Sequence, residues 1–142
     1  MTAGRLILWR HGQTDYNVGG RVQGLVDIPL NATGLAQAEV GARMLLDYLG
    51  TRSEDVLLVA SDLQRALATA QVLADLVDLE VQADSRLRER SLGVWEGLTG
   101  EEIIEGWGTE PIERWAAGHT PEGIGMEPKS KVAERVVAAV RE

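Results

Sequence analysis

The sequence predicts an α/β fold, a three-layer sandwich in which helices cover both faces of a mostly parallel sheet. Short, nearly continuous apolar runs alternate along the chain with longer segments whose apolar residues recur with the helical period. The chain has 142 residues, of which 44% are apolar and 25% charged, as expected for one globular domain with its own core. We therefore expect a single domain over residues 1–142.

The first part of the chain is predicted to form a strand, a loop and a helix. Residues 5–9 are a short apolar run that ends at polar residues, which is typical of a strand buried on both faces. Residues 12–34 are rich in Gly, Asn, Asp and Thr and predict a long ordered loop. Residues 35–49 repeat apolar side chains with the helical period, and Thr33 and Gly50 are suited to cap that helix.

The middle of the chain is predicted to form a strand, a helix and a further strand. Residues 56–60 are a second buried apolar run, and Ser61 and Asp62 can cap the helix that follows. That helix carries one apolar stripe over residues 63–77. Residues 80–83 fit a short third strand, after which the chain leaves the sheet.

The last part of the chain is predicted to contain two helices around an irregular segment. Thr99 and Glu102 have the spacing of a capping box, which predicts a short helix beginning at that point. Residues 106–128 are rich in glycine and proline, so we expect the least regular part of the chain there. Residues 130–142 return to a helical pattern.

An α/β alternation normally adds one more strand after such a helix. We therefore expect the domain to be incomplete at its C-terminus. A chain without that strand would expose sheet edges and apolar helix faces, which predicts aggregation or homodimers.

Composition excludes several classes of function. The formal net charge is −8, and a field of that sign repels nucleic acid and anionic membranes. The chain has no cysteine, which excludes cysteine nucleophiles, cysteine-bound metals and disulfides. No apolar run approaches the roughly 20 residues that a membrane-spanning helix needs, and residues 1–5 lack the pattern of a secretion signal. We expect a cytoplasmic protein without a nucleic-acid or membrane partner.

Polar residues that follow the predicted strands are the first candidates for a site, because ligands of open α/β sheets bind beyond the carboxyl ends of the strands. His11 follows the first predicted strand, Arg65 the second and Glu89 the third. The full set is Arg10, His11, Gly12, Thr14, Asn17, Ser61, Asp62, Arg65, Arg86, Arg88 and Glu89.

These residue types suit phosphoryl transfer. A histidine flanked by arginines can attack phosphorus, because guanidinium groups neutralise the phosphoryl oxygens and hold the group in line with the imidazole. A carboxyl group can then protonate the leaving oxygen. Arg65 also lies in the first turn of a predicted helix, where backbone N–H groups favour an anion.

Three motifs in this order resemble the signature of the histidine phosphatase superfamily, in the branch that also contains the cofactor-dependent phosphoglycerate mutases. They are residues 8–14 with Asn17, Gln23 and Gly24, then residues 61–66 with Thr69 and Ala70, then residues 87–89 with Gly93, Trp95, Glu96 and Gly97. The resemblance is specific over residues 5–98. Residues 10–19 also resemble the glucosyl-3-phosphoglycerate phosphatases of actinobacteria.

The resemblance implies a phosphoglycerate-mutase-like fold and a phosphatase that needs no metal and no cofactor. His11 would accept the phosphoryl group and form a phosphohistidine that water hydrolyses, with Glu89 as acid and then base. The residues that would bind the phosphoryl oxygens are Arg10, Asn17 and Arg65. Further candidates for substrate contacts are Thr14, Gln23, Gly24 and Glu127. The expected substrate is a small phosphorylated metabolite, such as a phosphoglycerate or a sugar-phosphate derivative.

The family pattern contains a second histidine after a later strand, and this sequence ends before that point. His119 is the other histidine of the chain, and its place in the irregular segment predicts a solvated loop residue. Residues 121–127 lie where relatives have a Gly-Gly-Glu-Ser-like turn, and Glu127 is a candidate there as a carboxylate facing the substrate.

Several alternatives stay open at the level of the sequence. The chain could instead be a phosphoglycerate-type mutase, although residues 22–30 resemble the phosphatase branch, or a non-catalytic module that binds phosphate or a partner protein. Among single residues, Arg65 could be an exposed helix residue paired with Asp62 or Glu54, and Glu89 could be paired with Arg88 or Arg90. Trp107 and Trp115 are expected to pack under the irregular segment rather than to line a pocket.

Overall fold

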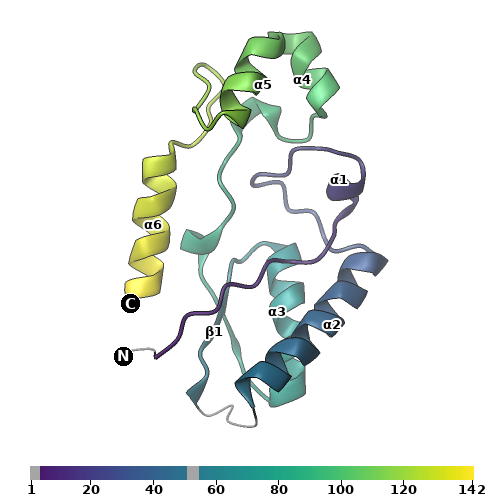
Figure 1. Cartoon of the computed structure of the whole chain (residues 1–142), viewed down its shortest axis with the longest axis vertical. Coiled ribbons are helices and arrows are strands. Elements are labelled where there is room, and N and C mark those ends of the chain that lie inside the picture. Colours follow the sequence, from purple (N-terminus) through teal and green to yellow (C-terminus); the bar gives the residue numbers. More distant parts are fainter. Residues whose placement is uncertain (1–3, 51–54) are drawn as a thin grey trace.

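The computed structural model describes residues 4–50 and 55–142, and it is α/β, as predicted. Residues 1–3 and Glu54, which entered the sequence predictions, lie outside the described residues. Figure 1 shows helix α6 on one side of strand β1 and helices α2 and α3 on the other, with α4 and α5 at one end of the molecule.

Two parallel strands form the sheet of the described residues. Strand β1 is Leu58–Ala60 and strand β2 is Val81–Ala83, with Leu58 opposite Val81 and Ala60 opposite Ala83. Helix α3, Gln64–Val77, connects them as the crossover that parallel strands require. It ends at Asp78, whose φ of 52° is in the left-handed region.

The prediction of a strand over residues 5–9, buried on both faces, is wrong for the described residues. This segment has no hydrogen-bonded strand beside it, and Leu8 is 85% exposed. The strand at residues 56–60 is also shorter and less buried than predicted, because Leu57 and Val59 face outward with no layer of described residues over them. An apolar run indicates a strand, but its burial depends on neighbours far away in the sequence.

Helix α2 is Ala32–Leu49, and it begins earlier than predicted. The side chain of Asn31, rather than that of Thr33, caps it by accepting from the backbone N–H of Gly34. Gly50 ends the helix as predicted, with a φ of 72°. Helices α2 and α3 pack through small buried residues, which are Ala38 and Ala42 on α2 and Ala70 and Ala74 on α3.

The 12–34 loop contains a short helix, and two short 3-10 helices lie at the start of the third motif and within it. Helix α1 is Asp15–Val18, η2 is Ser85–Leu87 and η3 is Gly93–Trp95. Ser61 and Asp62 do not cap α3 as predicted: α3 has no side-chain cap, and Asp62 pairs with an arginine of the third motif instead.

The segment predicted to be irregular contains a helix. Helix α4, Gly100–Trp107, starts with the predicted capping box of Thr99 and Glu102, but α5, Thr109–Ala116, was not predicted. Trp115 of α5 packs edge-on against the buried ring of Trp95, with ring centroids 5.8 Å apart. This contact buries one side of α5. The local pattern of a glycine-rich segment does not predict it, because Trp95 lies outside that segment. The core cluster beneath both helices is Leu92, Trp95, Ile103, Ile124 and Met126.

Helix α6, Lys129–Arg141, confirms the predicted last helix. It lies beside η2, and one face of it is partly buried. In the described ranges, no helix is long and apolar enough to cross a bilayer.

Candidate active site

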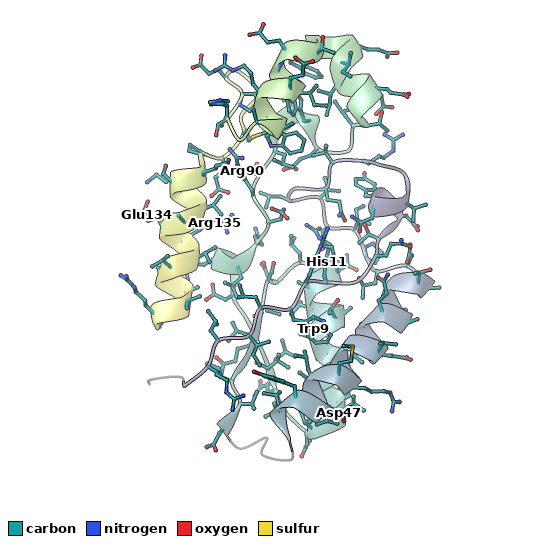
Figure 2. All side chains as sticks on the ribbon, viewed as in Figure 1. Trp9, His11, Asp47, Arg90, Glu134 and Arg135 are labelled. Carbon is teal, nitrogen blue, oxygen red and sulfur yellow. The ribbon has the colours of Figure 1, made fainter. Side chains whose placement is uncertain are left out.

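The candidate site is built around His11, at the end of the extended N-terminal segment (Figure 2). Its Nδ1 lies 2.7 Å from the carbonyl oxygen of Gly12. Because a carbonyl oxygen can only accept a hydrogen bond, Nδ1 carries the proton and the neutral imidazole keeps its lone pair on Nε2. Within the described residues this is the one hydrogen bond of the ring, so Nε2 is available to a substrate.

The backbone beside His11 is fixed by a close approach to two helices. The N–H of Gly12 donates to Oγ1 of Thr69 on α3 over 3.2 Å. A Cβ at Gly12 would collide with the carbonyl group of Gly34 at the start of α2, so only glycine fits here. This packing positions His11 relative to both helices.

Arg65 lies in the first turn of α3, directly after β1, and only 2% of it is exposed. Its Nη1 donates to the carbonyl of Val26 and its Nη2 to that of Gly24, each over 2.8 Å. These contacts use two of the five N–H groups of the guanidinium and leave three for an anion. The alternative pairing with Asp62 does not occur, since Asp62 binds Arg88.

Burial and the charges around His11 together lower its pKa. Burial lowers the pKa of His11 below 6.5 most strongly, and the positive charges of Arg65 and Arg10 lower it further. The hydrogen bond to the Gly12 carbonyl and the negative charge of Glu89 act in the opposite direction. Arg10, Arg65 and Glu89 are therefore within electrostatic reach of the imidazole, which is held in the neutral form that a nucleophile needs.

Glu89 follows β2 and η2 and reaches the same region from the other side. Its Oε1 accepts from the backbone N–H of Arg90 over 2.8 Å. The side chain of Arg88 pairs with Asp62, and that of Arg90 donates to the backbone carbonyl of Glu127. The Glu89 carboxylate consequently has no ion pair among residues 4–50 and 55–142.

Asn17, Thr14 and Gln23 form a connected group in the loop after His11. Oδ1 of Asn17 accepts from the backbone N–H of Thr14, and the Thr14 hydroxyl donates to Oε1 of Gln23 over 2.6 Å. Thr14 is fully buried, so its hydroxyl supports the loop from inside. The amide NH₂ groups of Asn17 and Gln23 have no partner within the described part of the chain.

The remaining predicted residues lie around this centre. Arg10 is exposed and adjacent to His11. Both carboxylate oxygens of Glu127 accept from Arg135 of α6, over 2.9 Å each, so Glu127 lies in an ion pair behind the Glu89 segment. His119 is an exposed loop residue, as predicted.

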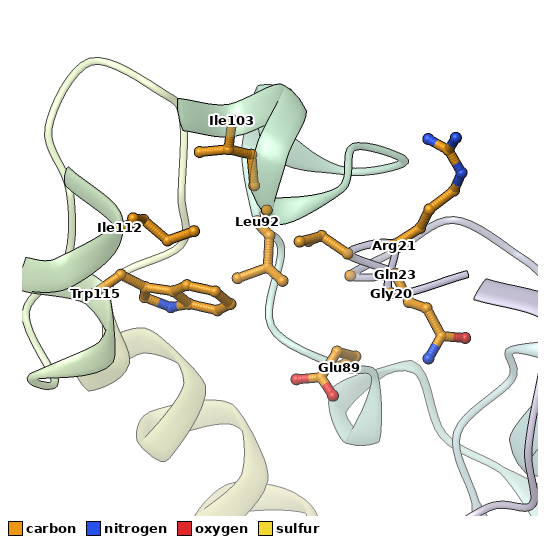
Figure 3. A pocket seen from close by; sticks show the side chains of 11 residues that line it. Gly20, Arg21, Gln23, Glu89, Leu92, Ile103, Ile112 and Trp115 are labelled. Carbon is orange, nitrogen blue, oxygen red and sulfur yellow. The ribbon is translucent and has the colours of Figure 1, made fainter. Parts of the chain in front are cut away.

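A pocket of about 360 Å³ opens beside Glu89 (Figure 3). Trp115 and Ile112 lie on one wall and Gln23 on the other, while Arg21 points away from the cavity. Arg21 is held there by the carbonyl of Gly97 and the carboxylate of Glu102. Trp115 packs on Trp95 as expected, but it also lines the pocket, so the expectation that it would not line one is wrong.

Two residues that support the site, Arg135 and Glu96, are not among the candidates that the sequence predicts. Arg135 occupies a position on the partly buried face of α6, three residues after Val132, and an arginine in such a stripe is a signal for a buried partner. Glu96 accepts from the backbone N–H groups of Leu25 and Leu92 and so joins two loops of the site. In the sequence, Glu96 stands out only as a member of the third motif.

No group of three or more His, Asp or Glu side chains that could hold a metal ion occurs in the described ranges. The arrangement of a neutral imidazole, a buried guanidinium and an unpaired carboxylate is one that can transfer a phosphoryl group.

The chain is similar in sequence to proteins of known families. A Mycobacterium tuberculosis protein named glucosyl-3-phosphoglycerate phosphatase is 48% identical over 103 residues, which are 72% of this chain and 44% of that protein. A Salmonella arizonae protein named probable phosphoglycerate mutase GpmB is 37% identical over 143 residues, which are 96% of this chain and 61% of that protein.

The chain is also similar to solved structures. A mycobacterial glucosyl-3-phosphoglycerate phosphatase in complex with VO3 superposes with a TM-score of 0.78 at 40% identity, over 92% of this chain and 62% of that one. Bacillus stearothermophilus YhfR superposes with a TM-score of 0.76 at 30% identity, over 93% of this chain and 63% of that one.

The chain thus spans 44% to 61% of the length of these two curated relatives. Residues 6–142 match the family model described as histidine phosphatase superfamily (branch 1). The chain belongs to the histidine phosphatase superfamily.

Proposed function

We propose that the protein is a phosphomonoesterase that hydrolyses a small phosphorylated metabolite through a phosphohistidine at His11. The observation that carries the proposal is the hydrogen bond from Nδ1 of His11 to the Gly12 carbonyl, which leaves the lone pair on Nε2 beside Arg65 and Glu89. The family membership and the phosphatase names of the relatives support it.

In the first step, Nε2 of His11 attacks phosphorus and the bond from phosphorus to the alcohol oxygen breaks. The free N–H groups of Arg65, together with Arg10 and the amide of Asn17, bind the phosphoryl oxygens and neutralise the charge that develops on them. Glu89, as the carboxylic acid, gives its proton to the leaving oxygen.

In the second step, the Glu89 carboxylate takes a proton from water. The water oxygen attacks phosphorus, the bond from phosphorus to Nε2 breaks, and neutral His11 and inorganic phosphate result. The pocket between Gln23 and Trp115 lies beside Glu89, so it is the place for the leaving alcohol.

The test is phosphate release from an aryl phosphate without added metal. We expect His11→Ala to lower the rate by about 10³-fold or more, and His119→Ala, which removes the exposed histidine, to leave it unchanged. Acid-labile labelling of the protein from a ³²P-phosphomonoester should depend on His11 alone. Activity or labelling that survives His11→Ala would overturn the proposal.

The same assay separates hydrolysis from isomerisation, which the resemblance to proteins named probable phosphoglycerate mutase makes the second candidate. With 3-phosphoglycerate as substrate, a phosphatase releases phosphate, whereas a mutase forms the isomer and releases none. Isomerisation without phosphate release would favour the mutase.

A further inference from the structure

The segment that carries Glu89 is tied down on both sides, although Glu89 itself has no ion pair. The side chains of Arg86 and Arg88 pair with Asp84 and Asp62, respectively. These contacts fix the flanking side chains, but none of them fixes the backbone of Glu89.

Arg135 of α6 makes that connection. Its Nη1 donates to the carbonyls of Arg86 and Arg88 over 2.7 Å each, and its Nη2 donates to the carbonyl of Glu89 over 3.2 Å. Its Nε and Nη2 also donate to the two carboxylate oxygens of Glu127. All five N–H groups of the guanidinium are therefore used.

The side chain of Arg135 points toward the segment that carries Glu89. Figure 2 shows Arg135 pointing from α6 toward the segment after β2, whereas Glu134 points to the opposite side. Arg135 is 20% exposed and Glu127 22%, so water competes weakly for these bonds. A planar guanidinium that binds three carbonyls and a carboxylate at once restricts both the position and the orientation of the backbone at Glu89.

We propose that Arg135 is a positioning residue that holds Glu89 in the geometry for protonating the leaving alcohol. The inference rests on the proposed function, in which Glu89 is the acid. A carboxyl group must lie within hydrogen-bond reach of the leaving oxygen, and a displacement of about 1 Å can lower the rate by about 10²-fold. Glu127 would then act by orienting Arg135.

The experiment compares two substrates that differ in their need for an acid. A nitrophenyl phosphate loses a phenolate that is stable without a proton, whereas an alkyl phosphate loses an alkoxide that needs one. We expect Arg135→Gln to lower kcat/KM, which reports the steps up to departure of the alcohol and not the later water step, by about 10²-fold for the alkyl ester and by less than about 3-fold for the nitrophenyl ester, following the usual contribution of a general acid. Arg135→Lys should fall between, because lysine has three donors and no planar fork.

Two controls distinguish positioning from stability. Lys131→Gln changes an exposed cation on the same helix and should leave the ratio of the two rates unchanged. Glu127→Gln weakens the orientation of Arg135 while its carbonyl contacts remain, and it should change the ratio in the same direction as Arg135→Gln but less. Urea unfolding of each variant confirms that the folded state is populated in the assay.

Hydrogen exchange provides a readout that needs no activity. Arg135→Gln should speed amide exchange in the segment of residues 86–90 more than in α3. Equal loss of kcat/KM on both esters, or unchanged exchange at residues 86–90, would overturn the positioning role. A wild-type chain that is inactive on both esters, or a His11→Ala variant that stays active, would overturn the proposed function itself.

Discussion

The backbone N–H of Gly12 donates a hydrogen bond to Oγ1 of Thr69, and the two residues are 57 positions apart in the sequence. The same hydroxyl donates to the carbonyl of Arg65 over 2.7 Å. One buried hydroxyl group thus joins the segment of the proposed nucleophile to the helix of the proposed phosphate-binding arginine. The relative position of His11 and Arg65 depends on this connection.

Replacing Thr69 by valine keeps the shape of the side chain and removes the hydroxyl. The buried N–H of Gly12 would then have no partner, which costs about 1 to 3 kcal/mol of unfolding free energy. We expect urea unfolding to show this loss, and the rate of phosphate release to fall because His11 moves relative to Arg65. Thr33→Val, at an exposed position of α2, is the control and should change stability by less than about 0.5 kcal/mol. Equal stability of Thr69→Val and wild type would contradict the role of the bond.

The lowered pKa of His11 predicts activity at mildly acidic pH. Burial and the charges of Arg65 and Arg10 keep the imidazole neutral below 6.5, the ordinary value, so the acidic limb of kcat/KM should lie below that pH. In Arg10→Gln one of the lowering charges is lost, and the pKa of His11 should rise toward 6.5.

NMR titration of the imidazole Cε1–H signal of His11 measures this shift directly, even where the variant is slow. Arg43→Gln, an exposed arginine of α2, serves as the control and should leave the titration unchanged. A pKa of His11 that stays in place in Arg10→Gln, or that falls, would show that Arg10 does not act on the imidazole.

The motifs in the sequence predict that His11, Arg65 and Glu89 lie close together, because the spacing within each motif is local, and their catalytic roles stay predictions. Arg65 and Glu89 do lie within electrostatic reach of His11, although the segment before His11 is not a strand in the described residues. The sequence does not predict the role of Arg135, because three of its acceptors are backbone carbonyls more than forty residues away, and such acceptors leave no trace in side-chain identity. Helical periodicity predicts α6, but it does not say which residue of α6 faces the site.

The errors in the fold have a related origin. The apolar run at residues 5–9 predicts a buried strand, and burial requires neighbours that the described residues do not provide. Helix α5 was missed because its stability comes from Ile112 and Trp115 packing near Trp95, and not from caps or propensity. The capping box of Thr99 and Glu102 was predicted correctly because both partners lie within one turn.

The ion pair of Glu127 with Arg135 predicts a loss of stability in acid. The hydrogen bonds from Arg135 hold the pKa of Glu127 below 4.5, so the carboxylate contributes stability that is fully present above that pH and is lost as the pH falls through the lowered value. Glu127→Gln should therefore be less stable than wild type at neutral pH by about 1.5 to 3 kcal/mol, the usual range for a hydrogen bond to a charged group.

Urea unfolding at several pH values checks the sign. The difference between wild type and Glu127→Gln should narrow as the pH falls below 4.5, since the protonated glutamate then resembles glutamine. Glu134→Gln breaks an exposed pair with Lys131 and should change stability by less than about 1 kcal/mol at every pH. A difference that widens in acid would contradict the assignment of this pair as stabilising.

The third motif contains a glycine on which the wall of the pocket depends. Gly93 has a φ of 60°, and a Cβ at this position would collide with the carbonyl of Ile124. Gly93→Ala must therefore strain the backbone and separate two segments of the core cluster, which predicts a loss of more than about 2 kcal/mol. Gly106 in α4 is the matched control, because a Cβ there meets nothing within 4 Å and its alanine variant should gain about 0.5 to 1 kcal/mol of unfolding free energy.

Gly93→Ala should also change the affinity for substrate, since Leu92 and Trp115 line the pocket beside Glu89. We expect KM to rise more for bulky phosphate esters than for methyl phosphate. Equal changes of KM for both would show that the core cluster does not shape the substrate site.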